Sequence, residues 1–595
     1  MSLFGEHIQG RRGSRVRIFF NGVGLEGYTL EPVSIALYYN GFKVLGRSKK
    51  LYRVRGFYSL SPQDRLMLAK VGGEYVNPCE VLCQESQEVH IDFSVPFLVK
   101  LSSPLLDGYF QHKKLVKNKI LWSLAVDKIK RLANHPKIRD MEAEKTGRIL
   151  EVESDVIVVG GGLSGLVATY TMSKLGLRVL LIDDSPALGG RMRYDHMDIP
   201  GVSMPREDLL RDLLSKITAN ENVRILTRTV FTGLFEDHPT AYSEYDKVLY
   251  ILNAKAYIIA TGLVDIPCIF RNNDLPGVFS GSTVLEMVNY YRVKPGRRGL
   301  IIGLSQNSLR IAEQLKKLGI DIILVSRLKH EDVEYDLSKI GEYVGNVREI
   351  QASGKTCVER VNIIHDSGRD EVKVDFIACS AFSIPDVRIL NQLNSKIVFL
   401  DNVGFIPIHD EYMNLKDNIF IAGGVSGSPY SILHLIEGEI AALSVAYKLG
   451  VKDAEPLVEE KIKEYRFKLS EMNVKWKNKI FEISRSGLIE NTSFTYPPTL
   501  FIEKPRRDAF ICFCEDITTE DVSRTVYEKG CKTLELVKRS LGVCTGRCQG
   551  RLCMVNASLY VSYLSNLDPD QVGLTKARAP TTPIPLHVLA GGGGE

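Results

Sequence analysis

Six cysteines near the carboxyl end of the chain are the residues whose spacing most clearly suggests chemistry. They fall within 42 residues and are Cys512, Cys514, Cys531, Cys544, Cys548 and Cys553. Cys512 with Cys514 and Cys548 with Cys553 form two pairs, separated by 33 residues that read as two helices. Four thiolates in two pairs suit a 2Fe–2S cluster, which takes two ligands on each iron. Zinc is the competing metal, because it also binds sets of four cysteines; a site without metal is the third alternative.

Two of the six cysteines have less certain roles. Cys544 competes with Cys553 for one ligand position, because both lie within five residues of Cys548. Cys531 follows Gly530 in a stretch expected to be helical, so we expect it to pack rather than to bind metal.

A glycine-rich turn supplies a second candidate site. Gly160, Gly162 and Gly165 follow the strand expected at residues 155–159 with GxGxxG spacing, and a helix and a second strand ending at Asp183 come next. In a dinucleotide site the first glycine allows the tight turn, the second lets backbone N–H groups approach a pyrophosphate, and the third lets helix and strand pack closely. Asp183 stands where an acid should accept the hydroxyls of an adenosine ribose. A glycine turn without a ligand is the alternative.

Further segments favour a flavoprotein with two dinucleotide domains. Gly189 and Gly190 let the chain pass close to a cofactor, and Arg191 could meet a phosphate; two later strands end in small residues, at 260–262 and 422–424. A redox cofactor in the same chain favours iron–sulfur over zinc at the cysteines, because zinc would be only structural. The candidate cofactor-binding residues are Gly160, Gly161, Gly162, Ser164, Gly165, Asp183, Asp184, Gly190, Arg191, Val230, Thr261, Gly262 and Gly424.

A second strand–turn–helix–strand pattern at residues 297–327 is degenerate. Ser305 and Ser308 replace the second and third glycines, and Arg327 stands where an acid would bind a ribose. We therefore expect a domain that is empty or structural, with an NADP phosphate on Arg327 as the alternative. No CxxC dithiol occurs in these domains, which disfavours thioredoxin-reductase-like chemistry.

Composition sets limits on the class of protein. At 595 residues the chain has room for about three to five domains, and 44% hydrophobic residues support sizeable cores. Its 76 basic and 71 acidic residues leave only +5, which gives no reason to expect a nucleic-acid partner. Without a signal-like amino terminus or an apolar run of about 18 residues, we expect a soluble cytoplasmic protein without a membrane partner, with its cysteines reduced or metal-bound.

Several motifs together resemble one family. The strings GRSKKLYRVRGF (46–57), VVGGGLSGL (158–166), IDDSPALGGR (182–191), CFCEDIT (512–518), LELVKR (534–539) and CQGRLC (548–553) are similar to those of the alpha subunits of heteromeric sarcosine oxidases. Dye-linked proline dehydrogenases, opine oxidases and hydrogen cyanide synthases are the family's relatives. The resemblance implies metal ligands at Cys512, Cys514, Cys548 and Cys553. It also implies FAD, or NAD or ATP in the same pocket, and an FMN at an interface with a beta subunit that carries the amine-oxidising flavin, with small additional subunits as further partners.

Together with the resemblance, the alternation of strands and helices predicts an α/β fold with two Rossmann-like domains of the two-domain flavoprotein type. We expect a β-grasp, ferredoxin-like domain at residues 1–110, a linker helix at 111–150 and the FAD/NAD-binding domain at 151–270 and 400–450. A degenerate second dinucleotide domain is expected at 271–399, a helical linker at 451–505, and a small helical 2Fe–2S domain with its tail at 506–595.

The sequence departs from the family pattern in two places. Where some relatives carry a second cluster in the N-terminal module, Ser59, Asp64 and Met67 stand near the expected cysteine positions, with only Cys79 and Cys83 nearby. We therefore expect no cluster in this module. The chain also ends before the folate domain of longer members, so folate-linked capture of formaldehyde is not expected.

The favoured function is an electron-transferring, cofactor-binding alpha subunit of a heteromeric oxidase or dehydrogenase that acts on an amine or imino acid of the sarcosine, proline or opine type. One alternative is a self-sufficient NAD(P)H-dependent flavin and iron–sulfur reductase, and another is a structural nucleotide-binding subunit. No catalytic residue is assigned, and His434 is expected to be a packing histidine in its helix.

Overall fold

The chain divides into two compact units, each assembled from distant stretches of sequence. The structure, a computed structural model, describes residues 12–48, 50–91, 118–120, 122–123, 147–195, 197–235, 238–329, 336–337, 340–401, 403–487, 494 and 496–590. Unit 1 comprises residues 1–140, 265–383 and 495–575, and unit 2 comprises 141–264, 384–494 and 576–595. Residues 384–399, expected with the inserted domain, therefore group with unit 2. The linker helix expected at 111–150 lies mostly outside the described residues.

The amino-terminal part of unit 1 is a small mixed sheet. Its strand order is β2-β1-β7-β5-β6, and the central strands β1 and β7 run parallel. Alternating exposed and buried side chains in β1 give the sheet one buried face, and Asn21 and Gly22, both with positive φ, form the turn to β2. The elements are β1 (Arg15–Phe20), β2 (Val23–Tyr28), α1 (Val33–Tyr39), β3 (Gly46–Arg47), β4 (Val54–Arg55), β5 (Ala69–Val71), β6 (Glu74–Val76) and β7 (Gln87–His90).

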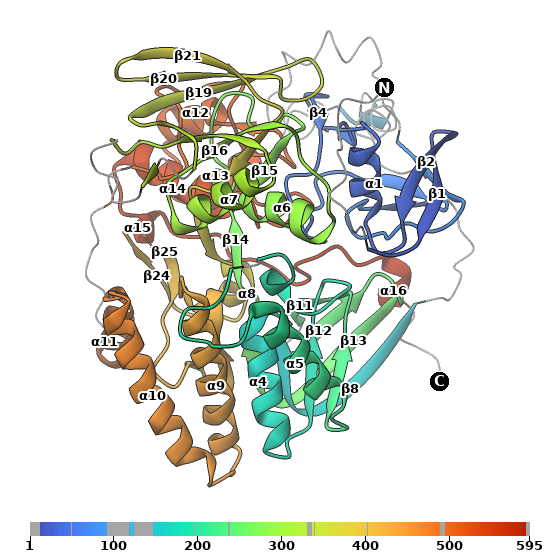
Figure 1. Ribbon diagram of the computed structural model, residues 1–595. Coiled ribbons are helices and arrows are strands. Elements are labelled where there is room, and N and C mark those ends of the chain that lie inside the picture. The colour runs from blue at the N-terminus through green and yellow to red at the C-terminus, as the bar shows by residue number, and fades with distance from the viewer. Residues whose placement is uncertain are drawn as a thin grey trace. The chain divides into compact units, whose positions relative to one another are not determined.

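The middle segment of unit 1 forms a parallel sheet of the kind that crossover helices produce. Its order is β15-β22-β16-β17-β18, and every neighbouring pair is parallel. Figure 1 shows an antiparallel meander of β19, β20 and β21 beside it. The elements are β15 (Val278–Ser280), α6 (Gly281–Leu285), β16 (Arg298–Ile302), α7 (Gln306–Lys317), β17 (Asp321–Val325), β18 (Glu342–Val344), β19 (Val347–Ser353), β20 (Arg360–His365), β21 (Gly368–Lys373) and β22 (Phe376–Cys379).

The cysteine-rich segment of unit 1 is mainly helical. The two helices predicted between the cysteine pairs are confirmed as α12 and α13. Each begins with a threonine N-cap, Thr518 and Thr533, whose hydroxyl accepts a backbone N–H. The elements are β28 (Phe510–Cys512), β29 (Ile517–Thr518), α12 (Thr519–Lys529), α13 (Leu534–Leu541), α14 (Met554–Ser565) and α15 (Pro569–Val572).

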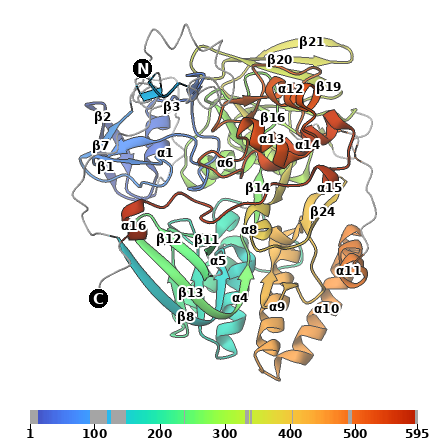
Figure 2. The same ribbon diagram turned by 180° about the vertical axis from the view of Figure 1, so that it is seen from behind.

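Unit 2 is built on one larger sheet with the order β10-β9-β8-β13-β12-β11, to which β27 adds beside β13. Strands β10, β9, β8, β13 and β27 are parallel, whereas β11 and β12 are antiparallel. Figures 1 and 2 show α4 and α5 on one face of this sheet. The elements are β8 (Arg148–Val159), α4 (Leu163–Lys174), β9 (Val179–Ile182), α5 (Arg206–Thr218), β10 (Val223–Leu226), β11 (Thr229–Phe235), β12 (His238–Ser243), β13 (Val248–Ile259), β26 (Asn414–Lys416), β27 (Ile419–Ile421) and α9 (Ser431–Lys448).

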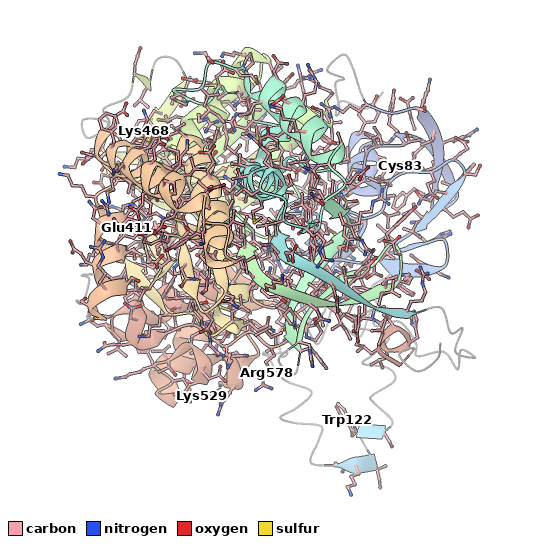
Figure 3. The ribbon with its side chains drawn as sticks, turned by 90° about the horizontal axis from the view of Figure 1, so that it is seen from below. Cys83, Trp122, Glu411, Lys468, Lys529 and Arg578 are labelled. Atoms are coloured by element: carbon pink, nitrogen blue, oxygen red, sulfur yellow. The ribbon has the colours of Figure 1, made fainter. Side chains whose placement is uncertain are left out.

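Two helices follow α9 and complete the core of unit 2. They are α10 (Ala454–Glu471) and α11 (Trp476–Ser486), within the segment predicted to be helical. Glu411, labelled in Figure 3, accepts hydrogen bonds from Arg466 of α10 and Arg485 of α11. Across the parts of the chain that the structure describes, no helix is both long and apolar enough to span a membrane.

A buried ion pair joins α9 to α11. The carboxylate of Glu437 lies 3.2 Å from the ammonium of Lys477, and both side chains are fully buried. Burial alone would raise the pKa of Glu437, but Lys477 and the neighbouring hydroxyls lower it to about 2. Lys477 also donates to the backbone carbonyl and hydroxyl of Ser426, at 3.0 and 2.7 Å. The two charges therefore depend on each other to remain ionised in the core.

Replacing Lys477 by methionine should leave the Glu437 charge buried without its partner. Breaking such a pair costs about 3–5 kcal/mol of folding free energy, so we expect a lower thermal unfolding midpoint and low recovery of folded protein. The matched control is Lys216→Met, since Lys216 pairs with Asp212 at 2.6 Å on the surface of α5; an exposed pair contributes little. Equal midpoints for both variants would contradict the assignment.

Candidate dinucleotide site and cysteine centre

The turn between β8 and α4 is shaped by two glycines that have no room for a side chain. Gly160 has a φ of +109°, and a methyl group there would overlap the carbonyl group of Ala260. A methyl group at Gly165 would overlap the carbonyl oxygen of Gly160. The first and third positions of the motif are thus fixed by packing inside unit 2, as their types predicted.

The second glycine is different, because among the described residues no atom lies close to the position of a side chain there. Gly162 is the N-cap of α4, has ordinary extended φ and ψ, and makes no side-chain capping bond. A methyl group at this position would meet no atom of the described part of the chain within 4 Å. The first N–H groups of α4 are therefore not capped by the N-cap side chain, and such N–H groups at a helix start are donors suited to a phosphate.

Asp183 directly follows β9 and lies beside this turn. Its Oδ2 accepts the Gly161 N–H at 2.6 Å, and its Oδ1 accepts the Ser185 N–H at 2.8 Å. Burial, with the neighbouring Asp184 charge, raises the pKa of Asp183 to about 6. Each carboxylate oxygen keeps a second lone pair for a hydroxyl donor, so the ionised side chain could still bind a ribose.

The other predicted residues of unit 2 gather around the same turn. The Gly189 N–H donates to the Gly161 carbonyl at 2.7 Å, and a methyl group at Gly190 would lie 3.0 Å from Gly162 Cα. Gly424 approaches Gly262 similarly, because a methyl carbon at Gly424 would lie 3.2 Å from the Gly262 carbonyl carbon. The Arg191 guanidinium lies 3.5 Å from the carbonyl oxygen of Leu263. The segments predicted to surround a cofactor are therefore neighbours.

Thr261 carries an unsatisfied polar atom at this site. Its hydroxyl is buried and, among the described residues, has no hydrogen-bond partner. Buried hydroxyl groups usually bind something, so this atom fits a bound molecule. Ser164 instead lies at the crossing of α4 and α9, where a methyl group at Gly438 would come within 2.6 Å of its carbonyl. Val230 is buried in β11 directly after Thr229, whose N–H bonds the Asp183 carbonyl at 2.9 Å.

Glu437 was not among the residues predicted from the sequence, although it holds the backbone beside the site at Gly423. Its Oε2 accepts the Gly423 N–H at 2.8 Å and the Ser426 hydroxyl at 2.8 Å. The sequence feature that could have indicated Glu437 is a carboxylate among the apolar residues of the helix that also contains His434. His434 itself bonds the Ser428 carbonyl through Nε2 at 2.7 Å, and burial lowers its pKa.

The second glycine motif, in unit 1, differs at the helix N-terminus. The Ser305 hydroxyl accepts the Ser308 N–H, and the Ser308 hydroxyl accepts the Ser305 N–H at 2.6 Å, so α7 is capped by its own side chains. Arg327 donates to the Leu500 carbonyl at 2.9 Å and the Tyr496 hydroxyl at 2.7 Å, and it stacks 4.0 Å above the Tyr496 ring. Both groups considered for a second nucleotide are therefore engaged inside unit 1.

The cysteine-rich segment brings five thiols together. The Cys514 and Cys548 sulfurs are 3.6 Å apart, the Cys544 and Cys553 sulfurs are 3.8 Å apart, and the Cys512 thiol interacts with the Cys553 thiol without a disulfide. The neighbouring thiols and burial raise the pKa of Cys512 and of Cys514 well above the ordinary range. Cys531 lies outside this group, with its thiol on the Lys529 carbonyl.

These distances suit thiolates that share a metal. Two thiolates bound to one tetrahedral metal at about 2.3 Å are about 3.8 Å apart. Within the described ranges, no group of three or more His, Cys, Asp or Glu side chains has the arrangement of a bound metal ion's ligands. Cys544 has an unfavourable φ of +66°, which places its thiol beside Cys553.

Two known protein families match parts of this chain. The family described as "Pyridine nucleotide-disulphide oxidoreductase" matches residues 154–450, and the family described as "Sarcosine oxidase A3 domain" matches residues 506–593. The α/β fold with a Rossmann-like dinucleotide domain is therefore confirmed.

The relatives narrow this class. The sarcosine oxidase alpha chain of Rhizobium meliloti (strain 1021) is 24% identical over 96% of this chain and 57% of that protein. One of the opine oxidase subunits of the same organism is 22% identical over 73% of this chain and 98% of its own length. The chain is a homologue of these two proteins, which confirms the resemblance, and it spans 57% of the length of the first relative.

One solved structure shows the same fold over nearly the whole chain. The crystal structure of L-proline dehydrogenase from P. horikoshii superposes with a TM-score of 0.71, covers 98% of this chain and 99% of its own, and is 23% identical. The likeness therefore extends beyond the dinucleotide domain to the parts of the chain on either side.

Substitution at two glycines should separate folding from nucleotide binding. The methyl group of Gly162→Ala meets no atom of the described residues, so the melting temperature without ligand should stay within a few degrees while affinity for an adenine dinucleotide falls at least tenfold. Gly165→Ala should reduce both, because its methyl group overlaps Gly160. Calorimetric binding and thermal unfolding of both variants check this. Unchanged nucleotide affinity in Gly162→Ala would show that no phosphate approaches there.

Binding should also depend on the ionisation of Asp183. A hydroxyl donor requires the carboxylate form, so affinity should fall by up to tenfold per pH unit below about pH 6. The raised pKa means that the folded protein holds this proton more tightly than the unfolded chain does, and stability without ligand falls as pH rises from about 4 to 6. Asp183→Asn should remove both dependences. Binding titrations and thermal unfolding of both proteins from pH 4 to 8 measure them.

Proposed function

We propose that this chain is an oxidoreductase subunit: the dinucleotide-binding, electron-transferring alpha subunit of a heteromeric oxidase or dehydrogenase that acts on an amine or imino acid. The observation that carries the proposal is the combination, in one chain, of an uncapped helix N-terminus beside Asp183 and a buried centre of five thiols. The relatives named for sarcosine oxidase and opine oxidase support the substrate class. The particular amine lies outside what this chain's residues specify.

The residues that would hold the nucleotide are those around the β8–α4 turn. The α4 N-terminus would bind the pyrophosphate, Asp183 the adenosine ribose, and the Thr261 hydroxyl a group that satisfies it. FAD is the proposed occupant, with NAD or ATP as the alternatives that contain the same adenosine. Arg191 adds a positive charge at the site, and Glu437 fixes the backbone at Gly423. A bound flavin supplies two-electron oxidation or reduction.

The proposed ligands of a 2Fe–2S cluster are Cys512, Cys514, Cys548 and Cys553, and such a cluster transfers one electron at a time. The separation of the Cys514 and Cys548 sulfurs supports this ligand set, whereas Cys553 lies close to Cys544. Binding must displace the protons of these thiols, and the raised pKa of Cys512 and of Cys514 makes that displacement dependent on pH. Cys544 remains the rival for one position.

The chemistry of the substrate is proposed to reside in a partner. A beta subunit would carry the amine-oxidising flavin, with FMN at its interface with this chain, and small additional subunits could complete the complex. The proposed location is the cytoplasm, where thiols remain reduced. Self-sufficient reduction by NADPH is not favoured, because Ser305 and Ser308 cap α7 and Arg327 is engaged.

The decisive experiment analyses the purified full-length chain, alone and with its beta partner. We expect an extractable adenine nucleotide and, after chemical reduction, the EPR signal of a 2Fe–2S cluster. Substrate should reduce the cluster and produce that signal only when the partner is present. Rapid bleaching by NADH or NADPH alone would identify a reductase instead. A bound nucleotide without visible absorbance would identify a structural subunit.

Cysteine variants test the ligand set in the same preparation. The EPR signal should survive Cys531→Ser, whose thiol lies outside the centre, and disappear in Cys548→Ser. Loss in Cys544→Ser together with retention in Cys553→Ser would exchange these two residues in the assignment.

A further inference from the structure

The N-terminal module contacts the loop that carries the first cysteine pair. Asp516, two residues after Cys514, is fully buried. Its Oδ2 accepts the Lys50 and Leu51 N–H groups at 2.9 and 3.0 Å, and its Oδ1 accepts the Arg55 guanidinium at 2.6 Å. The Lys50 ammonium also donates to the Glu515 carbonyl at 3.0 Å. The backbone directly after Cys514 is therefore fixed by residues 50–55.

The same module contacts the loop that carries the second pair. Arg551, between Cys548 and Cys553, donates to Asp64 at 2.6 Å, and the two side chains are only 13% and 1% exposed. Asp64 is held in turn by the Ser59 hydroxyl. Ser59 and Asp64 stand near positions where some members of the resembling family carry cysteines, and here they form part of a protein-to-protein contact.

An aromatic contact joins the module to the first loop as well. Tyr58 meets Phe513, the residue between Cys512 and Cys514, edge to face at 6.1 Å between ring centroids. The Tyr58 hydroxyl donates to the Asp265 carbonyl at 3.3 Å, so this ring is itself fixed. Residues 50–64 thus contact both loops through buried groups, and all of these contacts lie within unit 1.

We propose that residues 50–64 of the N-terminal module position the C-terminal cysteine centre. They do so through two contacts, one with Asp516 and one between Asp64 and Arg551. This inference rests on the proposed cluster and assigns the module a role that requires no cluster of its own. Groups that orient metal ligands from behind typically change metal affinity by about 10–100-fold when they are removed. Asp64 and Arg551 act through the loop and are not ligands.

The test compares Asp64→Asn and Arg551→Gln with wild-type full-length protein. Both variants should release iron to a chelator about tenfold faster or more, although they change the local charge in opposite directions. Because the two residues act as a pair, the double variant should be no worse than the more affected single variant. The reduced EPR spectrum should broaden in each, as expected when a ligand loop samples several positions.

The matched control is Asp386→Asn in unit 2. Asp386 pairs with Arg388 at 2.6 Å, the length of the Asp64–Arg551 pair, and both partners are nearly fully buried. This variant should lower the melting temperature without changing iron release or the EPR spectrum. If it accelerates release as much as Asp64→Asn does, the effect is general destabilisation and the proposal is wrong.

A measurement on the metal-free chain separates this proposal from the proposed function. Amide hydrogen exchange should rise in residues 546–553 of Asp64→Asn and in residues 510–518 of Asp516→Asn, each without the other. That pattern supports the positioning role even if wild-type protein binds no cluster, an outcome that would reject only the proposed cofactor. Unchanged exchange in both loops would overturn the positioning role, and so would iron release equal to wild type from protein that holds the cluster.

Discussion

The assembly of unit 1 depends on the two ion pairs that the buried guanidinium of Arg55 makes. The guanidinium lies between two fully buried carboxylates, Asp274 of the middle segment and Asp516 of the cysteine-rich segment. Arg53 adds a bond to Asp274 at 2.6 Å. Removing one partner from such a network would leave an uncompensated buried charge, so three stretches of chain are held together by groups that are each unfavourable without the others. The surroundings of the cysteine centre therefore depend on these ion pairs.

The two glycine motifs show how few atoms distinguish a nucleotide site from a structural helix start. Both have a strand, a tight turn at a glycine with positive φ (Gly160 and Gly303), and a helix. In α4 the N-cap is Gly162, which has no side chain to cap the first N–H groups. In α7 the Ser305 and Ser308 hydroxyls bind those N–H groups instead. The difference between the motifs is therefore one of hydrogen-bond partners, with the backbone course retained.

Much of this could be predicted because it is local. The glycine spacing, the capping threonines before α12 and α13, and the Asn21–Gly22 turn each determine the conformation of a few neighbouring residues. Glu437 was missed because a carboxylate in an apolar helix gives no sign of which backbone N–H it accepts. Arg327 was a phosphate candidate because it stands where an acid would bind a ribose, and no local pattern reveals its partner Tyr496, which is 169 residues away in sequence. The unit membership of residues 384–399 likewise depends on pairings that no local pattern encodes.

The sequence by itself determined the α/β class, the position of the β8–α4 turn, and which thiols are close enough in the chain to act together. These depend on backbone conformation and on contacts between near neighbours, which residue types govern directly. Only the tertiary structure decided that Asp64 meets Arg551 across 487 residues, that Arg55 joins Asp274 to Asp516, and that Cys544 approaches Cys553. The physical reason is that a buried charge or thiol is stabilised by whichever partner the fold brings to it, and the fold is chosen by the packing of all the segments at once.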